Sequence, residues 1–132
     1  MKVWNSDRLI FKDIHNLGYP IYHIHPYKQK VVHEICNLVN SILAYITHLI
    51  VFGSSVQSYH YNWCDLDICL VGNHSLLTND DYTALTRIHT NIDIIRVESL
   101  DMLNTLARLH FNSVYWNIRK DGVMVYDNSN RS

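Results

Sequence analysis

The amino-acid sequence predicts a mixed α/β fold of the α+β kind, in which a small mixed β-sheet is flanked by helices. Three observations predict it: apolar segments of strand length, longer segments with helical spacing, and an alternation of the two along the chain. The 132 residues, of which 48% are hydrophobic and 17% charged, are typical of a folded chain with one core rather than a disordered one.

We expect the chain to have three parts. Residues 1–26 mix short apolar pieces with turn-forming residues, so we expect an N-terminal extension of irregular structure. Residues 27–126 hold all the strongly periodic segments and are expected to form the folded domain. Residues 127–132 are polar and are expected to fray as a tail.

The first helix is predicted from Lys28 onward. Apolar residues recur every three or four positions between Val31 and Leu43, which places one apolar stripe along about four helical turns. Pro26, just before this segment, is a typical start signal. Lys28 and Lys30 are expected to be solvated at the start of the helix.

Four short apolar segments are predicted to be strands. Ile46–Phe52 is rich in β-branched residues and ends at Gly53, a pattern typical of a buried strand. The other three expected strands are Cys64–Val71, Ile92–Val97 and Val123–Tyr126.

Further helices are expected between these strands. Residues 79–90 have the composition of a helix whose first turn is capped by Asn79 or Asp80. Ser99 begins an imperfect capping box before the leucines of residues 100–109, which are expected to lie in the core. The remaining expected elements are a helix at Ser113–Lys120 and a turn at Asp121-Gly122.

Composition excludes several functional classes. A formal net charge of −1 argues against nucleic acid held by a general basic surface. Three cysteines without a C-x-x-C pair exclude a disulfide framework and a standard zinc ribbon. No run of roughly 18 uncharged apolar residues is present, so a membrane-spanning helix is not expected. The N-terminus lacks the apolar run of a signal peptide, and we therefore expect a cytoplasmic protein.

Three acidic residues are candidate metal ligands and catalytic groups. Asp65 and Asp67 lie at the start of a predicted strand, where alternation would place both on one face with Cα atoms about 7 Å apart. Asp93 lies in the next strand and would join them if the two strands pair. Crowded carboxylates repel unless cations neutralise them, and oxygen ligands favour Mg²⁺. Two ions roughly 3.5–4 Å apart would suit a phosphoryl displacement.

Gly53 and Ser54 are candidate nucleotide-binding residues. Glycine permits close approach of the backbone to a phosphate, and serine offers a hydroxyl and an N–H group. If residues 54–62 turn into a helix, its N-terminus would add a partial positive charge at that point.

This arrangement resembles the signature of the minimal nucleotidyltransferases of the polymerase-β-like superfamily. That signature is Gly-Ser, ten residues, Asp-x-Asp, and a third Asp on a later strand. Gly53, Ser54, Asp65, Asp67 and Asp93 occupy all five places, and the resemblance covers about residues 30–126. It implies the nucleotidyltransferase fold.

The sequence departs from the family pattern at three positions. Gln57 and Ser58 stand where members often carry a basic residue and a glycine, and Cys64 stands where they often carry a serine. Loss of the basic residue would weaken binding of the triphosphate. His60 and Arg96 are candidates to compensate for it.

The resemblance implies an enzyme that binds a nucleoside triphosphate, ATP by expectation, with two Mg²⁺ ions. It would pass the nucleoside monophosphate to an acceptor hydroxyl and release pyrophosphate. Asp65 and Asp67 would hold the ions, Asp93 would complete the metal site and help to deprotonate the acceptor, and Gly53 and Ser54 would hold the phosphates. Minimal members typically act as antitoxins that place AMP on a tyrosine of a helical HEPN-type RNase toxin, so a partner protein would supply the acceptor.

Several alternatives stay open at this stage. The domain would be a binding module that neutralises a partner by contact, with a vestigial nucleotide site, or an enzyme with a small-molecule acceptor in the cleft of a homo-oligomer. Tyr59, Tyr61 and Trp63 would either stack on a base or pack against the loop or a partner surface. His23, His25 and His33 are expected to be structural rather than zinc ligands.

Overall fold

The computed structural model describes residues 26–41, 43, 45–53, 65–89 and 91–127. Three sequence predictions therefore lie outside the described residues: the irregular N-terminal extension, the loop or helix after Gly53, and the C-terminal tail. The first predicted helix begins at Pro26, and the last predicted strand continues to Asp127.

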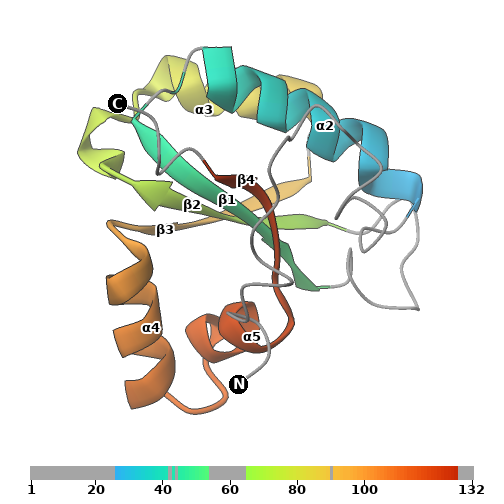
Figure 1. Cartoon of the computed structure of the whole chain (residues 1–132). Coiled ribbons are helices and arrows are strands. Elements are labelled where there is room, and N and C mark those ends of the chain that lie inside the picture. Colours follow the sequence, from blue (N-terminus) through green and yellow to red (C-terminus); the bar gives the residue numbers. More distant parts are fainter. Residues whose placement is uncertain (1–25, 42, 44, 54–64, 90, 128–132) are drawn as a thin grey trace.

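The described residues form a four-stranded mixed sheet with the strand order β3-β2-β1-β4 (Figure 1). Strand β1 is antiparallel to both of its neighbours, β2 and β4, whereas β2 is parallel to β3. The bounds are Ile46–Phe52 for β1, Leu66–Gly72 for β2, Ile92–Val97 for β3 and Val123–Asp127 for β4. The predicted bounds of β1 and β3 are confirmed, but β2 begins at Leu66, so Asp65 precedes the strand rather than lying in it.

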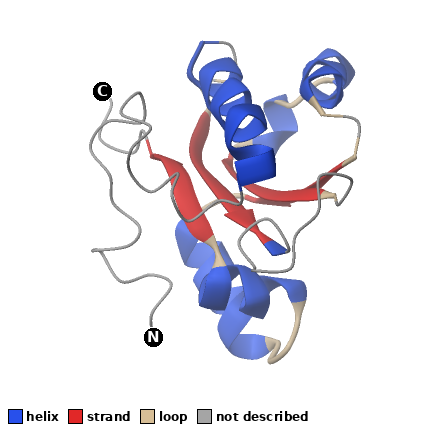
Figure 2. Ribbon diagram, turned by 90° about the vertical axis from the view of Figure 1, so that its right-hand side faces the viewer, coloured by secondary structure: helices blue, strands red, loops and turns tan. Residues whose placement is uncertain are grey.

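Helices cover both faces of the sheet (Figures 1 and 2). Helices α2 (Pro26–Ser41) and α3 (Asn79–Ile88) lie on one face, and α4 (Leu100–Leu109) and α5 (Val114–Asp121) lie on the other. A short 3₁₀ helix, η3 (His74–Leu76), which the sequence did not predict, follows β2. The predicted class, a small mixed sheet flanked by helices, is confirmed.

The cap of α3 differs from the prediction by one position. The N-cap is Thr78, not Asn79 or Asp80. Its hydroxyl oxygen accepts from the Asp81 N–H at 3.2 Å, while its own N–H donates to the Asp81 carboxylate at 3.0 Å. This is a capping box in which an aspartate occupies the place usually taken by glutamate. The hydroxyls of Ser99 and Ser113 cap α4 and α5 in the usual way.

The core lies on both sides of the central strands. The apolar stripe of α2 is buried as predicted, and Cys36 and Asn40 on this helix contact Val125 and Tyr126 of β4. Other fully buried side chains come from β1 and β2 on both faces, among them Leu49, Ile50, Ile68, Cys69 and Leu70.

Two predictions about exposure are wrong. Lys28 is buried in α2, at 1% exposure, although a solvated position was expected. Leu109 is 68% exposed, whereas Leu103 on the same helix is fully buried. Regular spacing of leucines indicates a helix, but the sheet and the neighbouring helix cover only part of its surface, so some of the leucines stay exposed.

Gly122, predicted as part of a turn, caps the end of α5 with φ −66°. A Cβ at this position would come 2.7 Å from Cγ2 of Ile50. The lack of a side chain at Gly122 therefore lets the end of α5 lie close to β1 at Ile50.

Candidate functional site

Asp67 and Asp93 stand opposite each other on neighbouring strands. Strands β2 and β3 run parallel in a register that pairs Leu66 with Ile92 and Asp67 with Asp93. Neighbouring strands are about 4.8 Å apart, and cross-strand partners project from the same face of a sheet. The sequence left open whether the strands that carry these two acids pair, and in the structure they do.

Asp67 carries the main electrostatic cost of this arrangement. Its side chain is half-buried, whereas those of Asp65 and Asp93 are exposed. Burial, followed by the charge and the hydrogen bond of Asp93 and by the charge of Asp65, raises the pKa of Asp67 to about 6. All of these causes disfavour the ionised carboxylate. The three acids therefore interact electrostatically, even though Asp65 lies outside the strand.

Gly53 lies next to Asp67, directly after the end of β1. Phe52, the last residue of β1, pairs with Asp67, and Gly53 follows with φ +73°. A Cβ on Gly53 would collide with Oδ2 of Asp67 and come within 3.1 Å of its Cγ. Only glycine combines this backbone conformation with this contact. Ser54, the next residue of the motif, lies outside the described residues.

The donor set suits a hard divalent cation. Asp67 and Asp93 offer carboxylate oxygens from adjacent strands, and Asp65 adds a third negative charge nearby. Oxygen-only ligands of this kind are those that Mg²⁺ prefers. In the part of the chain that the structure describes, no three His, Cys, Asp or Glu side chains already converge as a metal-binding group. Asp67 and Asp93, in register on adjacent strands, are the two residues that could hold a cation together.

Arg96 does not compensate for the missing basic residue at Gln57. Its guanidinium donates through Nη1 to the Tyr82 hydroxyl at 2.7 Å and lies 5.8 Å from the centroid of the Tyr82 ring. Tyr82 belongs to α3, which covers the face opposite α4 and α5. Because side chains alternate along β3, Arg96 points away from the face that carries Asp93.

The other sequence-predicted residues of the motif loop lie outside the described residues: Gln57, Ser58, Tyr59, His60, Tyr61, Trp63 and Cys64. So do His23 and His25, the first two histidines of the zinc alternative. His33 lies on α2, where its Nε2 is 3.5 Å from Nδ2 of Asn37.

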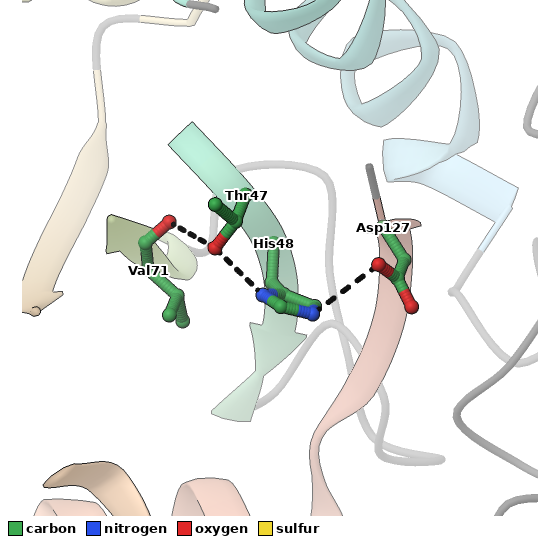
Figure 3. A network of polar contacts seen from close by, with 4 residues as sticks. All are labelled: Thr47, His48, Val71 and Asp127. Atoms are coloured by element: carbon green, nitrogen blue, oxygen red, sulfur yellow. Dashed lines mark hydrogen bonds and ion pairs between the residues drawn. The ribbon is translucent and has the colours of Figure 1, made fainter. Parts of the chain in front are cut away.

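A polar network on β1 was not singled out from the sequence (Figure 3). Nε2 of His48 lies 3.2 Å from the Asp127 carboxylate, and its Nδ1 lies 2.8 Å from Oγ1 of Thr47. The Thr47 hydroxyl also reaches the Val71 carbonyl oxygen at 3.1 Å. The signal in the sequence is a Thr-His pair inside an otherwise apolar strand.

Three comparisons with known proteins bear on this chain. No family model matches it, and no curated protein matches it. Among solved structures, it is similar to a "putative nucleotidyltransferase" from Sulfolobus solfataricus, with 19% sequence identity and a TM-score of 0.47. That similarity covers 76% of this chain and 80% of the other. In the described residues, no helix has the length and apolar character needed to cross a membrane.

Proposed function

We propose that this chain is a nucleotidyltransferase that transfers AMP from ATP to an acceptor hydroxyl and releases pyrophosphate. One observation carries the proposal: Asp67 and Asp93 face each other in register, with the Asp65 charge nearby and Gly53 pressed against the Asp67 carboxylate. Like charges gathered in this way oppose folding, and a bound cation would remove that cost. The match of all five signature residues supports the same activity.

The proposed roles follow from position. Asp67 and Asp93 hold the divalent cations, and Asp65 adds the third carboxylate. Bound Mg²⁺, in two sites, would neutralise the triphosphate and the charge that develops during transfer. Gly53, which has no side chain, lets the Asp67 carboxylate lie against the end of β1 and offers its backbone to the phosphates, and Ser54 contributes its hydroxyl and N–H group.

The transfer exchanges a phosphoanhydride bond of ATP for a phosphoester bond to the acceptor. The acceptor oxygen attacks the α-phosphorus of ATP and forms a new O–P bond. The bond from this phosphorus to the oxygen that bridges to the β-phosphate breaks, and pyrophosphate leaves with the electron pair. Asp93 takes the acceptor proton and, because its side chain is exposed, passes it to water.

The acceptor belongs to the same proposal. The chain resembles minimal nucleotidyltransferases that modify a tyrosine of a helical HEPN-type toxin, and we propose an acceptor of that kind here.

The test follows label from α-³²P-ATP with Mg²⁺ in the presence of a candidate partner protein. We expect Asp67→Asn to lower label transfer at least about 100-fold, because it removes a charge that acts in the transition state. Asp80→Asn, a matched change at an exposed position on α3, should leave transfer within about twofold. Calorimetry provides a second readout, in which ATP binding requires Mg²⁺ and weakens in Asp67→Asn. Equal transfer by wild type and Asp67→Asn would contradict the proposal.

A second candidate is a binding module that neutralises its partner by contact alone. The departures at Gln57 and Ser58 favour it, because they remove groups that relatives use at the nucleotide. This candidate predicts that Asp67→Asn neutralises the partner as well as wild type does, with no Mg²⁺-dependent ATP binding by either protein. The two candidates therefore give opposite results for the Mg²⁺-dependent binding of ATP.

A further inference from the structure

Helix α4 has a second apolar side that faces away from the sheet. Leu103 and Ala107 are buried toward the core, at 0% and 1% exposure. Met102 and Leu109 are 44% and 68% exposed. These two residues are seven positions apart, close to two full helical turns, so they lie on the same side of the helix. Figure 1 shows α4 at the periphery of the molecule, with α5 beside it.

Charged residues border this apolar side in a regular way. Asp101 and Arg108 are both exposed and are also seven positions apart, so they follow one flank of the stripe at a separation of about 10 Å along the axis. Thr105, a smaller residue, lies midway between them. The acid is near the start of the helix and the base is near its end.

We propose that this side of α4 binds the same side of a second copy of the chain, with the two helices antiparallel about a twofold axis near Thr105. Such an axis places the start of one helix opposite the end of the other, and it keeps the charged flanks of both helices on the same edge of the interface. Asp101 of one copy then faces Arg108 of the other, and the same contact occurs twice. A parallel pairing about a twofold axis would instead place the two charged flanks on opposite edges of the interface, so Asp101 and Arg108 would not meet.

The small area that the two helices can bury indicates a weak dimer. A ten-residue helix is about 15 Å long, so one helix pair covers less than the roughly 800 Å² per partner of a standard interface. Phe111, just beyond the end of α4, is 71% exposed and packs against Trp116 in a tilted arrangement with ring centroids 4.8 Å apart. We therefore expect a dimer with a dissociation constant in the micromolar range or weaker. The pairing uses none of the proposed catalytic acids and stands independently of the proposed function.

The test is sedimentation equilibrium of the full chain over a range of concentrations. Wild type should show a monomer–dimer equilibrium. D101R and R108D should each raise the dissociation constant at least about tenfold, because each places like charges opposite each other twice. A one-to-one mixture of the two variants should form a mixed dimer, because every facing pair in it is of opposite sign.

Two further variants test whether dimerisation depends on the apolar side of α4 or on any exposed leucine. Leu109→Ser should weaken the dimer, whereas Leu76→Ser, which changes a leucine that is 52% exposed on η3, should not. Circular dichroism of each variant confirms that it is folded. Wild type that stays monomeric at about 1 mM would overturn the proposal. So would folded D101R and R108D variants that dimerise as wild type does, or that fail to pair when mixed.

Discussion

Two polar side chains at opposite ends of one face of the sheet, those of His48 and Asp67, have contrasting surroundings. The register pairs His48 with Val71 and Phe52 with Asp67, so His48 and Asp67 point from the same face, four strand positions apart. At the His48 end, the imidazole lies beside the Asp127 carboxylate and the hydroxyl of Thr47. At the Asp67 end, the carboxylate meets like charge.

The direction of each pKa shift records this difference. Burial lowers the pKa of His48, and the Asp127 carboxylate opposes that effect. Burial raises the pKa of Asp67 to about 6, and Asp93 and Asp65 add to that effect. Neighbours thus reduce the cost of burial at one end and increase it at the other. The first end supports the fold, whereas the second is the place where we propose that a cationic ligand binds.

The largest effect on stability is expected from His48→Ala. The side chain is 7% exposed, and its loss removes the contact with Asp127, opens a cavity and leaves the Thr47 hydroxyl without the imidazole. We expect the free energy of unfolding to fall by about 2–3 kcal/mol, measured by urea denaturation. Thr47→Ser, which keeps the hydroxyl, is the matched control. A loss below about 0.5 kcal/mol in His48→Ala would mean that the network does not support the fold.

An intermediate effect is expected from Gly53→Ala. The left-handed backbone and the contact with the Asp67 carboxylate should together cost about 1–2 kcal/mol of unfolding free energy. In an Asp67→Ala background the contact is gone, so the same change should cost less. An equal cost in both backgrounds would show that only the backbone angle matters at Gly53.

The smallest effect is expected from the titration of Asp67 in the absence of added divalent cations. Its carboxyl has an ordinary pKa of 3.8 and a pKa of about 6 in the folded chain. The unfolded state therefore loses this proton first, and stability from this group is present below about pH 4 and lost as the pH rises to about 6. Comparison with Asp67→Asn isolates the group, because other acids titrate in both proteins.

Asp67→Asn should accordingly match wild type near pH 4 and exceed it at pH 7. The excess is about 1 kcal/mol, since partial solvation reduces the full value of the shift. Chemical denaturation at the two pH values measures it. If the variant is less stable than wild type at pH 7, the carboxylate makes favourable contacts there, and the contrast with His48 is lost.

Much of this molecule was predictable from local spacing. Strands β1 and β3 have their predicted bounds, and α4 spans the segment whose leucines have helical spacing. These elements were predictable because the period of a helix or strand is visible within a short stretch of sequence. The motif acids were also identifiable, because aspartate is depleted in β-strands and two aspartates at the start of an apolar strand are therefore unusual. Their roles as ligands and catalysts remain predictions.

The sequence alone therefore determined which segments form helices and strands, and which residue types mark the candidate site. Tertiary structure decided the rest: the strand order that sets Asp93 beside Asp67, the contact of Gly53 with that carboxylate, the partner of His48, and the exposure of Leu109. The physical reason is that a residue's period along the chain fixes the direction of its side chain within one element. What lies in that direction depends on residues far away in sequence, which are brought there by packing.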